Sequence, residues 1–217
     1  MLGRLRLTPP PEPVPTAAST EGGTIILFLP ARNEGPRIGE VIASAPSHID
    51  THPVEIVVID DGSTDDTASV ARATGATVIG HSTNQGLGAA VRTGFAHAAS
   101  QRASAAAFCD ADGEYDPAEL EHLVRPILAG DAHYVVGSRF GGDIQRMLPH
   151  RRLGNQALTR WVRFVTRMPV TDGQSGYRAL SSAALADVEI AHDYNYAQVL
   201  TIDLIAKGYG YHEVAIT

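Results

Sequence analysis

The chain of 217 residues is 44% hydrophobic and has a formal net charge of −7. This length and composition support one substantial core, so we expect a single domain. The acidic balance excludes a broad nucleic-acid-binding face, which needs clustered cationic side chains to neutralise phosphates. No apolar run approaches the roughly 20 residues of a membrane-spanning helix, and we therefore expect a cytoplasmic protein.

The chain begins with a segment unlike the rest. Residues 1–23 contain a proline-rich run followed by small polar residues, a composition that buries too little apolar surface to offset its ordering entropy. We therefore expect a disordered tail over residues 1–23 and a folded domain over residues 24–217.

From Thr24 onward, short apolar runs alternate with segments of helical periodicity. Strands are predicted at residues 25–29, 54–59, 77–79, 105–109 and 134–137. Helices are predicted near residues 38–45 and 65–73, and from residues 86 and 117. This alternation indicates βαβ units. Strands that are apolar on both faces form a mostly parallel sheet between two helix layers, so the fold class is predicted to be α/β and Rossmann-like.

The alternation ends after Phe140. An arginine-rich helix is predicted around residues 148–167, then a polar stretch at 172–178, a helix at 196–207 and a last apolar run at 214–216. We expect this half to cover the sheet and to supply the acceptor side of a binding site.

Four polar clusters each follow a predicted strand directly. They are Pro30 to Glu34, Asp60 to Ser63, Asp110 to Gly113, and Gly137 to Arg139. Ligands of open α/β sheets bind outside the carboxyl ends of the strands, so we expect these loops to converge on one crevice.

Two pairs of carboxylates stand out in these clusters. Asp110 and Asp112 would direct both side chains toward one hard divalent cation, although a turn with Asx hydrogen bonds produces the same pattern. Asp60 and Asp61 are predicted to accept hydrogen bonds from a nucleobase or ribose. The following Asp65 and Asp66 favour helix capping.

Six motifs occur in one order along the chain. They are Pro30-Ala-Arg-Asn-Glu34, Val58-Ile-Asp-Asp-Gly-Ser-Thr-Asp65, Asn84-Gln-Gly-Leu-Gly88, Asp110-Ala-Asp112, Gly137-Ser-Arg139 and Thr171-Asp-Gly-Gln-Ser-Gly-Tyr-Arg178. Together they resemble the family 2 glycosyltransferases of GT-A fold, nearest to the polyprenol-phosphate enzymes of the dolichol-phosphate mannose synthase type. The resemblance covers roughly residues 24–217.

The resemblance implies a donor site for a nucleotide-diphosphate sugar, with Mg²⁺ or Mn²⁺ held on the diphosphate by Asp110 and Asp112. The residues that it assigns to the donor are Pro30, Ala31, Asn33, Glu34, Asp60, Asp61, Asp110, Ala111 and Asp112. Nearest members of the family often have a glutamine after the Asp-x-Asp, where this chain has Gly113 to Pro117. Both GDP-mannose and UDP-glucose types of donor therefore stay open.

The resemblance also implies transfer with inversion, in which the acceptor displaces the nucleoside diphosphate in line. Asp112, Arg139 and Asp172 are the predicted catalytic residues. For a polyprenyl phosphate acceptor, already an anion, only cations are needed to position it. The predicted acceptor-binding residues are Arg139, Arg151, Arg152, Ser175 and Arg178. A hydroxyl acceptor needs a base instead, for which Asp172 is the candidate, although Asp172-Gly173 is also typical of a turn.

Six arginines lie between residues 146 and 167, interleaved with apolar side chains. A basic amphipathic helix of this kind suits a membrane surface with anionic lipid head groups, and an ordinary surface helix has the same pattern. Peripheral placement at the inner face of the membrane belongs to the lipid-acceptor hypothesis. The alternatives are a soluble glycosyltransferase with a small hydroxyl acceptor and a non-catalytic nucleotide-binding partner subunit. The oligomeric state is left open.

Overall fold

The computed structural model describes residues 22–139, 168, 170–190 and 196–217. Its strands are β1 (Ile25–Ala31), β2 (His48–Ile49), β3 (His52–Asp60), β4 (Thr77–Gly80), β5 (Ala105–Phe108), β6 (Tyr134–Ser138), β7 (Arg178–Ser181) and β8 (Tyr211–Ala215). Its helices are α1 (Gly35–Ser44), α2 (Thr67–Ala73), α3 (Leu87–Ser100), the 3₁₀ turn η1 (Pro117–Glu119), α4 (Leu120–Leu128), α6 (Ser182–Asp187) and α7 (Tyr196–Ala206).

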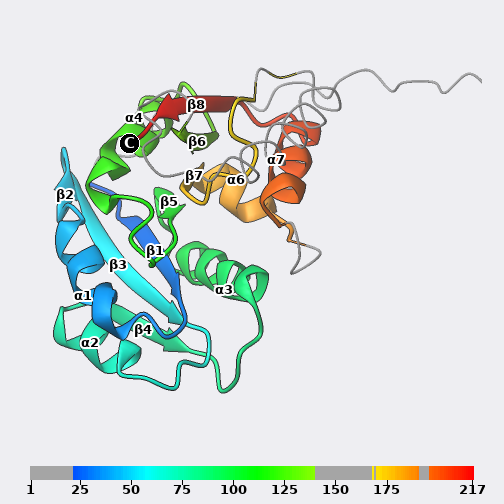
Figure 1. The fold of residues 1–217 in the computed structure, drawn as a ribbon. Helices are drawn as coiled ribbons and strands as arrows, with labels where there is room; N and C mark the ends of the chain where they lie inside the picture. The colour runs from blue at the N-terminus through cyan, green and yellow to red at the C-terminus, as the bar shows by residue number, and fades with distance from the viewer. Residues whose placement is uncertain (1–21, 140–167, 169, 191–195) are drawn as a thin grey trace, which may run out of the picture.

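The strands form one mixed sheet in the order β2-β3-β1-β5-β7-β6-β8, with β4 also paired to β3. Strands β1, β3, β4 and β5 run parallel, and β6 and β8 are parallel to each other. Strand β7 is antiparallel to both β5 and β6. The predicted α/β fold with a mostly parallel sheet in a single domain is confirmed, and the sheet is curled (Figure 1).

Alternate side chains of each central strand enter two separate cores. In β1, Ile25, Leu27 and Leu29 belong to the core that also contains side chains of α1 and α4, whereas Ile26 and Phe28 belong to the core that contains side chains of α3 and α7. Figure 1 shows α1 and α2 on one side of β1 and β3 and α3 on the other. This period of two is what a strand buried on both faces requires, since successive side chains point to opposite faces.

The second half of the chain differs from its prediction in three places, one of which is the helix α6 (Ser182–Asp187), which was not predicted. The stretch at residues 172–178 leads into the antiparallel strand β7, which was not predicted as a strand. The last apolar run only partly belongs to β8, which begins earlier, at Tyr211, and ends at Ala215, before Ile216. The helix expected at residues 148–167 lies outside the described residues, as do residues 1–21 of the expected tail. Among the described residues, no helix is both long and apolar enough to cross a membrane.

Three aromatic rings pack together between α3 and the sheet. Phe28 lies 5.2 Å from Phe95 and 5.3 Å from Phe108, measured between ring centroids. Gly94 lets the helix approach, because a Cβ atom added there would lie 2.3 Å from the Phe28 ring. Close contact of this kind leaves no room for one more methyl group.

We predict that Gly94→Ala lowers the free energy of unfolding by about 1–3 kcal/mol, although alanine favours helices, because overpacking outweighs helix propensity. Urea denaturation measures the change. Gly39→Ala in α1 is the control, since its added Cβ would lie 3.3 Å from Val70, and it should change stability by less than about 1 kcal/mol. A stabilised Gly94→Ala protein would show that α3 does not pack as described.

Candidate active site

The loops after β1 and β3 are joined by hydrogen bonds. Asn33 adopts a positive φ of 56°. Its N–H donates to Ser63 Oγ at 2.9 Å, and its side-chain oxygen accepts from the N–H of Thr64 at 2.8 Å. The Asp60 carboxylate in turn accepts from the N–H of Ser63 at 3.0 Å. Asn33 and Asp60, both predicted at the nucleotide, therefore lie on one continuous rim.

The same two loops fix the start of α1. The N–H of Glu34 donates to Thr67 Oγ1 at 2.8 Å, and the N–H of Gly35 donates to Asp65 at 3.1 Å. Asp65 also accepts from the N–H of Thr67 at the start of α2. Asp65, rather than Asp66, thus makes the capping contact, and it serves the first turns of both helices.

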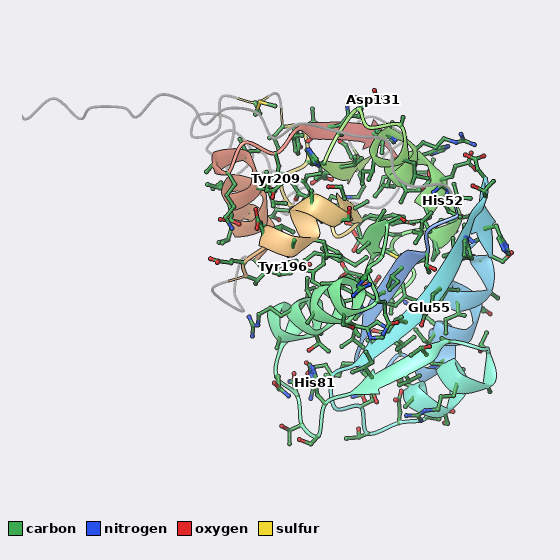
Figure 2. The ribbon with its side chains drawn as sticks, turned by 180° about the vertical axis from the view of Figure 1, so that it is seen from behind. His52, Glu55, His81, Asp131, Tyr196 and Tyr209 are labelled. Carbon is green, nitrogen blue, oxygen red and sulfur yellow. The ribbon has the colours of Figure 1, made fainter. Side chains whose placement is uncertain are left out.

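Asp61 lies beneath this rim and is only 5% exposed. Its carboxylate accepts from the N–H groups of Gln85 and Gly86, each at 2.8 Å, and lies 2.7 Å from the ring of His81. His81 lies at the edge of the fold near β4 (Figure 2). Burial raises the pKa of Asp61, but the bonds from Gln85, His81 and Gly86 outweigh it and lower the pKa below its usual value. These contacts point to holding the loop at Gln85, in place of the predicted nucleotide contact.

Asp61→Asn should lower the free energy of unfolding by about 2–3 kcal/mol near neutral pH, because an amide cannot accept both backbone bonds. The native pKa is lowered, so the stabilisation is present above the unfolded pKa of about 3.9 and is lost as pH falls through the native pKa. Urea denaturation over a pH series should show the two proteins converging below about pH 4. The exposed Asp131→Asn is the control (Figure 2). A difference that does not change with pH would contradict this assignment.

Asp110, Ala111 and Asp112 follow β5 at the centre of the sheet. Asp112 accepts from the N–H of Glu114 at 2.9 Å, and its backbone carbonyl accepts from Arg37 at 2.7 Å. None of the described residues donates a hydrogen bond to the Asp110 side chain. Burial, followed by the charges of Asp112 and Glu114, raises the pKa of Asp110 to about 7.

This donor set fits a hard divalent cation. Two neighbouring carboxylates offer only oxygen, and the side chain of Asp110 has no donor among the described residues to compensate its charge. Within those residues no group of three His, Cys, Asp or Glu side chains forms a metal cluster. One or two carboxylates completed by substrate phosphates is the arrangement that Mg²⁺ commonly takes.

The loop before β7 approaches Asp110 from the other side. A Cβ atom on Gly176 would lie 2.4 Å from Asp110 Oδ2, so only glycine fits there. The N–H of Gly176 donates to the hydroxyl of Tyr115 at 2.7 Å. Glu34 also belongs to this acidic region, because burial and then the charge of Asp112 raise its pKa.

Arg139 follows β6 and faces the same region. Its Nε donates to Asp172 Oδ2 at 2.9 Å and its Nη2 to Asp172 Oδ1 at 3.3 Å, while its Nη1 donates to Glu114 at 2.8 Å. The guanidinium lies over the ring of Tyr115, 5.5 Å from its centroid. Two of the predicted catalytic residues, Arg139 and Asp172, are thus brought together as an ion pair.

Glu213 on β8 holds the backbone of this loop. Its carboxylate accepts from the N–H of Thr171 at 2.8 Å and more distantly from the N–H of Asp172, at 3.4 Å. Thr171 Oγ1 lies 2.6 Å from Ser138 Oγ, at the end of β6. The position of Asp172 therefore depends on β8 as well as on β6.

Arg178 is completely buried, and so is Ser175. The guanidinium donates to five neutral oxygen atoms: the carbonyls of Gly173, Ser175 and Ala197 and the hydroxyls of Tyr134 and Thr201. These contacts shape the loop from inside, which argues against the acceptor contacts predicted for both residues. Arg151 and Arg152, also predicted at the acceptor, lie outside the described residues.

Three residues of this region were not predicted: Glu114, Tyr115 and Glu213. Glu114 and Tyr115 follow the Asp-x-Asp pair after one glycine, and this closeness in the sequence could have indicated both residues. Glu213 had no such signal, because 41 residues separate it from Asp172.

The chain matches the family model of glycosyl transferase family 2 over residues 26–194. It therefore belongs to this family, as its motifs predicted. A relative from Mycolicibacterium smegmatis, named polyprenol monophosphomannose synthase, is 30% identical over 205 residues, which cover 88% of this chain and 76% of the relative. One from Methanococcus voltae, named UDP-N-acetylglucosamine–dolichyl-phosphate N-acetylglucosaminyltransferase, is 31% identical over 180 residues, which cover 74% of this chain and 70% of the relative.

Among solved structures, glucosyl-3-phosphoglycerate synthase from Mycobacterium tuberculosis, bound to Mn²⁺, UDP-glucose and phosphoglyceric acid, superimposes with a TM-score of 0.70 at 26% identity. The match covers 90% of this chain and 71% of that one. The chain spans 65% to 76% of the length of the two named relatives and of a third curated relative.

Proposed function

We propose that this protein transfers a hexose from a nucleotide-diphosphate sugar to the phosphate of a polyprenyl lipid, with inversion at the anomeric carbon. The observation that carries the choice of acceptor is the burial of Asp172 and its pairing with Arg139. The candidate base is fully buried and bound through both oxygens to Arg139. A carboxylate that is shielded from solvent and whose two oxygens both accept from Arg139 is poorly placed to take a proton from an acceptor hydroxyl, which would have to come within hydrogen-bond distance of it. The site therefore suits an acceptor that is already ionised.

Donor binding is proposed for the edge of the sheet between Asn33 and Asp112. Asn33 and Asp60 would contact the nucleoside from the rim described above, with Pro30 and Ala31 at the end of β1 beside them. Asp110 and Asp112 would hold Mg²⁺ or Mn²⁺. Such an ion, when bound, neutralises a diphosphate and stabilises its charge as it leaves. The solved relative with Mn²⁺ and UDP-glucose supports this arrangement.

The proposed reaction breaks the bond between the anomeric carbon and the donor diphosphate. An oxygen of the acceptor phosphate forms the new bond from the opposite face, and the nucleoside diphosphate leaves with the electron pair. No proton has to be moved when the acceptor is a phosphate anion. Arg139 would hold that anion in line, since a guanidinium binds phosphate through a planar pair of donors. A lipid acceptor would place the enzyme at a membrane surface.

A small phosphorylated acceptor is the second candidate, favoured by the similarity to a structure that holds phosphoglyceric acid. Its nucleophile would be a hydroxyl, and its phosphate or carboxylate would still suit Arg139. The two candidates differ in which acceptor oxygen receives the sugar, and this difference makes them separable by product analysis.

The test supplies UDP-glucose or GDP-mannose with Mn²⁺ and offers polyprenyl phosphate, 3-phosphoglycerate or a neutral sugar as acceptor. We expect mass spectrometry to detect hexosyl polyprenyl phosphate. Asp112→Asn and Arg139→Gln should each lower its rate by roughly 100-fold or more, because each removes charge stabilisation at the reacting groups. Asp131→Asn, an exposed surface change, should keep the wild-type rate.

Three other outcomes would each change the proposal. Product from 3-phosphoglycerate alone would favour the second candidate. Product from the neutral sugar alone would remove the argument from Asp172. No product with any acceptor, together with intact nucleotide binding, would favour a non-catalytic partner subunit.

A further inference from the structure

The guanidinium of Arg139 holds two carboxylates that differ sharply in exposure. The side chain of Asp172 is 0% exposed, whereas that of Glu114 is 51% exposed. Asp172 binds the edge formed by Nε and Nη2, and Glu114 binds Nη1 at 2.8 Å. Tyr115 lies against the plane of the group. Among the described partners of Arg139, Glu114 is therefore the exposed one.

These two contacts differ in how easily they are broken. Removing one partner from a buried ion pair is strongly destabilising, because the other charge is left buried and uncompensated. An exposed ion pair contributes little to stability. Nη1 and Nη2 each carry an N–H at the end of the guanidinium, so a phosphate that displaces Glu114 can bind through two donors, and this charge-assisted contact is stronger than that of a single exposed carboxylate oxygen. Glu114 can thus be displaced by an incoming phosphate, whereas Asp172 stays.

We propose that Glu114 is a resident competitor for the anion site of Arg139. Its carboxylate occupies the donor that the anionic group of the acceptor uses, and it leaves when that group binds. Glu114 then sets the affinity for anionic acceptors and selects against weakly charged ones. That this anion is a group of the acceptor rests on the proposed function, but the competition for Arg139 does not.

The alternative role for Glu114 is to position Arg139, and the two roles predict opposite signs. If Glu114 competes, its neutralisation strengthens anion binding at Arg139. If it only orients the guanidinium, its loss weakens binding. Glu121→Gln is a matched control, because Glu121 is 48% exposed and pairs with Arg125 on α4 at 2.5 Å.

The experiment titrates inorganic phosphate calorimetrically into the full chain at low ionic strength, without divalent metal. Glu114→Gln should bind phosphate about 3- to 10-fold more tightly than wild type, and Glu121→Gln should match wild type. Adding Arg139→Gln to Glu114→Gln should abolish the gain. Arg139→Lys is the second variant, since it keeps a cation beside the buried Asp172 if the glutamine variant fails to fold.

Equal or weaker phosphate binding by Glu114→Gln would overturn the proposal, as would no measurable binding by either protein. A gain that survives the loss of Arg139 would also overturn it, since it would reflect overall charge alone. In the transfer assay, Glu114→Gln should lower the acceptor KM. Tighter phosphate binding without any transfer would remove the proposed function and keep the competition. Transfer with a raised acceptor KM would keep the proposed function and overturn the competition.

Discussion

The ion pair between Arg139 and the buried Asp172 joins the two halves of the site. Arg139 follows β6 and Asp172 precedes β7, and the antiparallel pairing of these strands sets the end of one beside the start of the other. Glu213 on β8 then fixes the backbone at Thr171 and Asp172. Because a broken buried ion pair costs several kcal/mol, this contact holds the loop at Gly176 against Asp110.

Around this ion pair the site carries more negative than positive charge. Burial first, and then neighbouring carboxylates, raise the pKa values of Glu34 and Asp110: Asp112 acts on both, and Glu114 acts on Asp110. A divalent cation would relieve this repulsion on the donor side. On the proposed acceptor side, Arg139 has one buried partner, Asp172, and one exposed partner, Glu114, which we propose that it exchanges. The same excess of carboxylates is thus the basis of both the proposed metal site and the proposed anion site.

The parallel half of the fold was predictable because its signals are local. The apolar runs of β1 and β5 and the carboxylates after them place the donor loops on one edge, whatever the details of packing. Strand β7 was missed because Arg-Ala-Leu-Ser is short and begins with a charged residue. Arg178 was predicted to bind the acceptor because the sequence shows that an arginine is present but not that five neutral oxygens surround it. The contacts of Asp61 and Glu213 also depend on pairing across the fold.

The central proposal is that Asp110 and Asp112 bind a nucleoside diphosphate through a divalent metal. Calorimetric titration of GDP and UDP, with and without Mn²⁺, into wild type and Asp112→Ala tests it most directly. We expect one of the two nucleotides to bind in the presence of Mn²⁺, its affinity to fall at least tenfold without the metal, and Asp112→Ala to remove this dependence. Binding of equal strength with and without Mn²⁺, or an unchanged affinity in Asp112→Ala, would contradict it.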